Sequence, residues 1–182
     1  MSASAPFQSV YRIADLSQSR PTAFSLVPDS ADMKTISDML GLSGLRKLRF
    51  VGEINAQGKS DWRIDAQLGA TVVQPCVVTL EPVSTRIDQP VTRLYLAAYE
   101  EPEGSEVEMP EDDTVEPLPK EIDLSAVMIE ALALHIPTYP RASDAGLDQT
   151  VFTEPGKSPL TDDDVRPFAG LAALRGKLGD GE

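Results

Sequence analysis

The sequence predicts an α+β fold, in which one antiparallel β-sheet packs against two helices. Two observations lead to this prediction. Apolar residues recur at helical spacing near residues 29–41 and again near residues 123–137. Between these segments, at about residues 47–97, they follow the alternation of strands. Because the strands succeed one another with short connections, they favour an antiparallel sheet over parallel β-α-β units.

Two short strands and a helix are expected ahead of the main sheet. Residues 7–16 alternate loosely between apolar and polar, and residues 24–27 form a second short apolar run that ends at a proline. The helix begins at Asp29 or Ser30, either of which can cap it, and Gly41 stops it. Its apolar residues are Met33, Ile36, Met39 and Leu40.

Four strands are expected in the sheet itself, at residues 48–54, 62–68, 71–80 and 86–97. Residues 55–60 contain Gly58 and predict a hairpin turn between the first two strands. A sheet of this kind is either open or curled towards a barrel. The second helix begins at Asp123 and ends before Pro137.

Negative charge is concentrated in the second half of the chain. Lys and Arg number 16 and Asp and Glu number 29, so the net charge is −13. Up to Ala98 there are 10 basic and 9 acidic residues, whereas the rest of the chain has 6 basic and 20 acidic residues. We expect residues 99–120 to form a long, mobile acidic loop, because like charges repel and prolines interrupt regular pairing. This loop is either a solvated linker or an electrostatic arm for a basic partner.

The chain is expected to form one α+β domain at residues 1–140, which includes the acidic loop. Residues 141–182 contain several prolines and predict a partly flexible tail. A short helix is expected within this tail at residues 162–178. Its apolar stripe consists of Phe168, Leu171 and Leu174. The stripe docks either on the domain or on a partner.

Composition excludes several classes of protein. A chain this acidic is a poor general nucleic-acid binder, since such binding depends on Lys and Arg neutralising phosphates, and we expect no DNA partner. A single cysteine excludes an internal disulfide framework. No apolar run approaches the roughly 20 residues that span a membrane, and no secretory signal is evident. We therefore expect a cytoplasmic protein with no membrane contact.

No arrangement of residues predicts catalysis, a cofactor or a metal ion. Phosphate-binding glycine loops and the Gly-x-Ser-x-Gly turn of serine hydrolases are both absent. The one histidine, His135, is typical of a helix end, and the one cysteine, Cys76, is typical of a small apolar side chain in a sheet. The run Asp162–Asp164 suits a helix N-terminus rather than a magnesium site.

One basic cluster, Arg46, Lys47 and Arg49, stands at the start of the first long strand. Strand alternation predicts that Lys47 and Arg49 point to the same face, where their charges reinforce one another. The cluster is either a solvated sheet face or a small surface that contacts RNA phosphates or a partner.

Three stretches, taken in order, resemble one known family. They are residues 76–83 (CVVTLEPV), residues 122–140 (from IDL to the motif HIPTYP) and residues 166–178 (RPFAGLAALRGKL). The pattern is similar to that of the YceD family, the large ribosomal RNA subunit accumulation proteins. The resemblance extends over about residues 10–178, with the acidic loop at the expected place.

The resemblance implies a non-catalytic factor that supports 23S rRNA accumulation and large ribosomal subunit biogenesis. Its partner would be a precursor of the large subunit, through either 23S rRNA or a basic ribosomal protein. The family supplies no catalytic residues to transfer. Two alternatives stay open: an enzyme acting on RNA or a small metabolite, and a generic protein-interaction module.

One departure from the family pattern concerns metal binding. Many relatives carry a Cys-x-x-Cys pair at the positions of Cys76 and Thr79, with a further His or Cys after the Pro140 turn. Here the second position is threonine, and residues 141–147 contain neither His nor Cys. A tetrahedral zinc site needs about four nitrogen or sulfur ligands. We therefore expect this chain to bind no zinc.

Overall fold

The computed structural model describes residues 9–99, 114–146, 154 and 156–158. It divides the chain into two compact units, Met1–Ala145 and Gly146–Glu182, and the elements below all belong to the first. Most of the expected acidic loop (residues 100–113) and the expected tail helix with Phe168, Leu171 and Leu174 lie outside the described residues.

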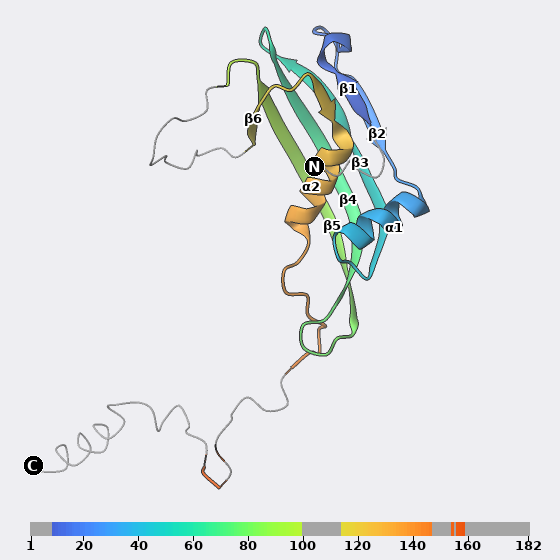
Figure 1. Cartoon of the computed structure of the whole chain (residues 1–182), viewed down its shortest axis with the longest axis vertical. Coiled ribbons are helices and arrows are strands. Elements are labelled where there is room, and N and C mark those ends of the chain that lie inside the picture. Colours follow the sequence, from blue (N-terminus) through green and yellow to red (C-terminus); the bar gives the residue numbers. More distant parts are fainter. Residues whose placement is uncertain (1–8, 100–113, 147–153, 155, 159–182) are drawn as a thin grey trace, which may run out of the picture. The chain divides into compact units, whose positions relative to one another are not determined.

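The main sheet has five strands in the order β2-β3-β4-β5-β6 (Figure 1). Their bounds are Thr22–Leu26 (β2), Gly44–Gln57 (β3), Asp61–Pro75 (β4), Pro82–Leu96 (β5) and Val115–Pro117 (β6). Neighbours pair antiparallel except β5 and β6, which are parallel. The predicted α+β class and the mostly antiparallel sheet are confirmed. The sheet is open, with β2 and β6 as its edges, so it does not close into a barrel.

Strand β4 is longer than the sequence predicts. The expected strands at residues 62–68 and 71–80 are one continuous strand, and the turn comes after Pro75 instead. Gly69 and Ala70 do not break it, because both neighbouring strands pair across this point: Gly69 lies opposite Arg49 on one side and Asp88 on the other. Tertiary pairing therefore outweighs the low strand propensity of glycine.

The two predicted helices of the domain are confirmed, and each begins at an aspartate. Helix α1 covers Ser30–Met39, and the Asp29 side chain accepts hydrogen bonds from the backbone N–H groups of Ala31 and Asp32. Helix α2 covers Leu124–His135 and is capped in the same way by Asp123. Gly41 follows α1 with a φ of 64°, a left-handed conformation that glycine adopts at little cost.

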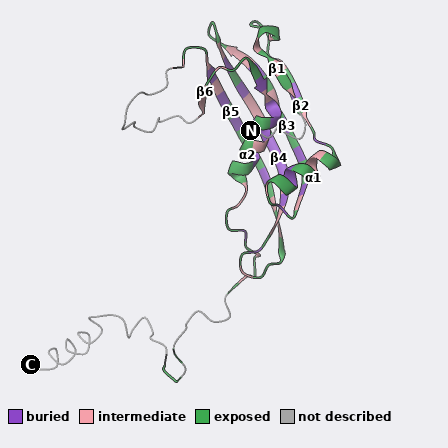
Figure 2. Ribbon diagram, in the orientation of Figure 1, coloured by how far each residue is buried: buried purple, intermediate pink, exposed green. Residues whose placement is uncertain are grey.

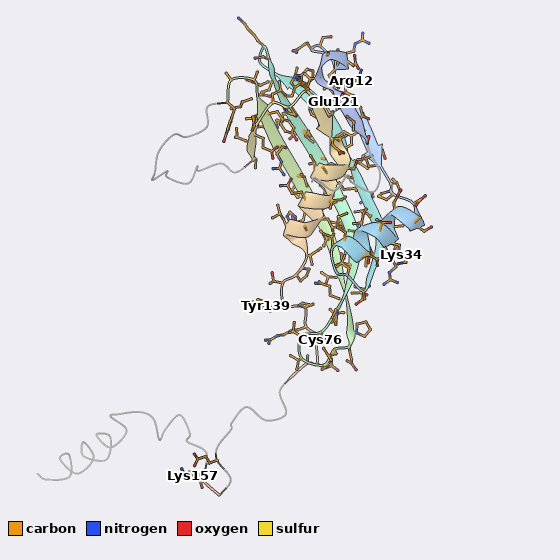
Figure 3. The ribbon with its side chains drawn as sticks, viewed as in Figure 1. Arg12, Lys34, Cys76, Glu121, Tyr139 and Lys157 are labelled. Atoms are coloured by element: carbon orange, nitrogen blue, oxygen red, sulfur yellow. The ribbon has the colours of Figure 1, made fainter. Side chains whose placement is uncertain are left out.

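A second, two-stranded sheet joins the N-terminal segment to the residues before α2. Strand β1 (Val10–Arg12) pairs antiparallel with β7 (Glu121–Asp123), and Arg12 bonds Glu121 at 3.1 Å, a pair labelled in Figure 3. The strand expected at residues 7–16 is thus shorter, since a 3₁₀ turn (η1, Ile13–Asp15) follows β1. Strand β6 lies within residues 99–120, which the sequence predicted as loop throughout.

The core lies between the sheet and both helices, on one face of the sheet only (Figures 1 and 2). Fully buried side chains alternate along the long strands and meet those of α1 and α2; the larger ones include Trp62, Phe50, Ile36, Leu48, Ile54 and Met128. Each such side chain contributes roughly 1.5–3 kcal/mol through burial. The opposite face of the sheet carries exposed side chains in the described part of the chain and is called the open face below.

Candidate functional site

Four basic side chains converge on the open face. Arg46, Lys47 and Arg49 come from β3, and Arg86 comes from β5, two strands away. A hollow of about 290 Å³ lies among them, lined by Lys47, Arg49, Thr71 and Arg86. We call these four lining residues, with Arg46 and Asp88 beside them, the basic hollow. The predicted cluster is therefore brought together, and Arg86 completes it.

A β-bulge in β3 exposes all three of its cations. Arg46 lies opposite Thr71 and Arg49 lies opposite Gly69, so β3 has one residue more than β4 in this interval. The extra residue is accommodated at Lys47, whose φ is 54°. With regular alternation, Arg46 would share the core face of Leu48. The bulge instead buries Leu48 and leaves the flanking cations on the surface.

Gly69 allows Arg49 and Arg86 to lie close to the backbone of β4. A Cβ atom at this position would lie 2.7 Å from Nε of Arg49 and 2.9 Å from Nη2 of Arg86. These distances are shorter than real Cβ contacts, so a side chain here would displace the two arginines. Because glycine has no side chain, both guanidinium groups lie close over β4 and beside each other.

Asp88 holds the Arg86 side chain and lies near that of Arg49. Arg86 donates from Nε and Nη2 to the two carboxylate oxygens, at 2.6 and 2.5 Å, and Arg49 Nη2 lies 3.7 Å from Oδ1. The hydrogen bond from Arg86, with the charges of Arg86 and Arg49, lowers the pKa of Asp88. The carboxylate therefore stays ionised at neutral pH. Four cations against one anion leave the basic hollow positive.

Arg86 is the site residue that sequence reasoning missed. It lies about 40 positions beyond the predicted cluster, and only the register of β3, β4 and β5 brings it there: Arg46 and Arg86 both lie opposite Thr71. Its Nη1 donates to Thr71 Oγ1 at 3.5 Å. The available signal was the alternation Arg86-x-Asp88, which puts both charges on one face of a strand.

Cys76 lies in the turn after β4 and is fully buried (Figure 3). Its sulfur accepts backbone N–H groups from Val78 and Ala142 at 3.4 Å and from Thr79 at 3.5 Å. The Thr79 side chain, and then these backbone groups, lower the pKa of Cys76 to about 6. The residue expected to be an apolar side chain within a strand thus lies in a turn, where three backbone N–H groups point at its sulfur.

The surroundings of Cys76 do not fit a zinc ion. The chain segment that closes over the sulfur contributes the backbone N–H of Ala142, which is a hydrogen-bond donor and not a ligand. Thr79 stands where a second thiolate would be needed. In the described ranges, no three His, Cys, Asp or Glu side chains come together as a possible metal site.

His135 lies at the C-terminal end of α2, as predicted. Its Nδ1 is 2.8 Å from the carbonyl oxygen of Ala131, one turn earlier in the same helix. This contact is a local one within the last turn of the helix. Among the described residues, no helix is both long and apolar enough to cross a membrane.

Comparison with known proteins gives one match. The family model described as "Large ribosomal RNA subunit accumulation protein YceD" matches residues 64–175, which is more than half of the chain. The matched range includes Cys76 and, from the basic hollow, Thr71, Arg86 and Asp88; the three cations of β3 precede it. No curated protein and no solved structure matches.

Proposed function

Since the chain belongs to the YceD family, we propose that it is a non-catalytic factor that supports 23S rRNA accumulation and the biogenesis of the large ribosomal subunit. It acts in the cytoplasm by binding a precursor of that subunit. The observation that supports this mechanism is the hollow on the open face that three cations line, with Arg46 beside them, in an otherwise acidic protein.

The chemistry of the basic hollow supports binding rather than catalysis. Arginine is protonated at every physiological pH, so Arg49 and Arg86 donate hydrogen bonds and accept no protons. Asp88 is the carboxylate beside them, and its lowered pKa makes it a weak general base. The surface is therefore suited to holding an anionic partner in place.

The acidic half of the chain supports a second contact. Residues after Ala98 hold 20 acidic and 6 basic residues. Such a charge attracts a basic partner and raises its association rate, and the effect weakens with added salt. We assign contact with a basic ribosomal protein to this half of the chain and contact with the precursor's anionic groups to the basic hollow.

Affinity capture from the protein's own cells tests the proposal. The tagged full chain is recovered at low and at high salt, and precursor 23S rRNA and large-subunit proteins are quantified against an unrelated tagged protein at equal expression. We expect enrichment of both at low salt and a loss of both at high salt. Recovery of neither would contradict the proposal and favour the enzyme or the generic interaction module.

A further inference from the structure

We infer that the basic hollow binds the phosphate backbone of double-helical RNA without reading its bases. The inference rests on the proposed function and identifies the part of the precursor that the open face contacts. Three features support it: the paired guanidinium groups, the burial of the aromatic rings in the described strands β2 to β6, and the placement of the cations on one rigid sheet.

The paired guanidinium groups match phosphate oxygens. A guanidinium group has five N–H donors, and two of them can bond two oxygens of one phosphate at once. Arg86 already donates from Nε and Nη2 to Asp88, so its remaining N–H groups and those of Arg49 are the donors available to a phosphate. Asp88 bonds Arg86 through two atoms and lies 3.7 Å from Arg49, while Gly69 leaves room for both side chains. Because two hydrogen bonds already hold the Arg86 side chain, it loses little conformational freedom on binding.

Exposed aromatic residues are missing where single-stranded RNA would need them. Sheets that bind single strands stack the bases on aromatic side chains. The aromatic residues of β2 to β6 are Phe24, Phe50, Trp62 and Tyr95, and all four are buried in the core on the other face. The open face of the described sheet therefore provides cations for phosphates and no platform for bases.

The placement of the cations on one rigid sheet favours a helix over a single strand. The backbone of Arg86 lies about 10 Å across the sheet from the β3 cations, while its guanidinium group meets that of Arg49 beside Asp88. A double helix presents its phosphates in stiff, fixed rows, so several of these cations bind without ordering the RNA. A single strand would first have to be ordered, at a cost that stacking does not offset here.

An acidic protein surface is the competing partner for these cations. Carboxylates accept the same guanidinium hydrogen bonds. Ribosomal RNA is the precursor's dense source of negative charge, whereas a basic ribosomal protein would be repelled by the basic hollow. We therefore assign the hollow to RNA and use an acidic peptide as a control.

The first test compares three probes with the purified full chain by fluorescence anisotropy. They are a labelled RNA hairpin with a stem of about 16 base pairs, an oligouridine of equal length, and polyglutamate. We expect the hairpin to bind about tenfold more tightly than either other probe. Exchanging its base-pair sequence leaves the affinity unchanged. The logarithm of affinity falls with the logarithm of salt with a slope of about −3, as for three to four phosphate contacts.

Variants test whether the binding occurs at the basic hollow. Arg49→Ala and Arg86→Ala each weaken hairpin binding about three- to tenfold and reduce the slope by about 1. Arg63→Ala is the matched control, because Arg63 lies at the other end of β4 and pairs with Asp65 at 2.8 Å.

Gly69→Ala weakens binding with no change of net charge, because its Cβ displaces both arginines. Thermal unfolding checks that each variant is folded, and the two arginines lie on different strands, so one local misfolding would not account for both losses.

Four results would overturn the inference: equal affinity for oligouridine, equal affinity for polyglutamate, no hairpin binding at 50 mM salt, or unchanged binding by all three hollow variants. Two results distinguish a failure of this inference from a failure of the proposed function. Captured precursor particles without hairpin binding contradict only the inference. Hairpin binding without captured particles contradicts the proposed function.

Discussion

Gly52 and Gly69 both lie within long strands, yet a side chain would meet a different obstacle at each. At Gly52 a Cβ would lie 2.3 Å from the backbone oxygen of Asp65 and 2.6 Å from Cα of Ala66, so β3 and β4 approach too closely for any side chain. At Gly69 it would meet only the ends of flexible side chains. The first glycine is required by the fold and the second by the basic hollow.

Gly52→Ala should therefore destabilise the protein by about 2 kcal/mol, because backbone atoms must shift. Gly44→Ala is the matched control on the same strand, since its Cβ would lie 3.6 Å from the Val73 side chain, an ordinary contact. Urea unfolding measures both. Equal stability of the two variants would contradict the close approach at Gly52.

Cys76 should titrate near pH 6 in the folded protein. Absorbance of the thiolate at 240 nm measures this directly, because the chain has a single cysteine. The unfolded thiol titrates near about 8.5. Because folding lowers the pKa of the thiol, its ionisation stabilises the folded protein. This stabilisation is complete above the pKa of the unfolded thiol and is lost as pH falls towards 6.

Thr79→Val should raise the pKa of Cys76 in the folded protein, since the Thr79 side chain makes the largest contribution to lowering it. Identical folded and unfolded titrations would refute the hydrogen-bonded thiolate.

At the scale of elements, Arg93 connects three of them. It is buried on the core face of β5 and pairs with Glu116 of β6 and with Glu130 of α2, the latter at 2.9 Å. Glu116, which belongs to the expected acidic loop at residues 99–120, therefore has a structural role: it anchors a three-residue strand at the edge of the sheet. The same ion pairs join α2 to the sheet.

Arg93→Met should cost about 2 kcal/mol of unfolding free energy, because the half-buried carboxylate of Glu116 loses its partner and both ion pairs between the elements are lost. Arg63→Met removes an exposed pair instead and should cost less than about 1 kcal/mol. Chemical denaturation compares the two. Similar losses would mean that Arg93 does not hold β6 and α2 in place.

At the scale of the whole molecule, local patterns predicted most of the fold. The caps at Asp29 and Asp123 depend on side-chain bonds to backbone two or three residues away, which is why both helix starts were predicted correctly. The long strands were found because one face is buried and the other is not, which produces alternation. The family resemblance was confirmed over residues 64–175.

The features that the sequence did not predict depend on pairing between distant residues. The bulge at Lys47, the unbroken β4 through Gly69 and the short strand β6 are each set by neighbouring strands. Arg86 joins the basic hollow for the same reason. Periodicity reports which face a residue occupies but not which distant residue lies beside it. The candidate cluster was therefore located, while its geometry and its fourth cation were not.

The most direct test of the central claim is complementation in cells that lack this protein, with the ratio of 23S to 16S rRNA as the measurement. We expect the wild-type chain and Arg63→Glu to restore the ratio. Arg49→Glu and Arg86→Glu change the net charge by the same amount as Arg63→Glu. At the same protein level, these two variants should fail to restore the ratio. Equal restoration by all four chains would contradict a role for the basic hollow, and failure of the wild-type chain would contradict the role in 23S rRNA accumulation itself.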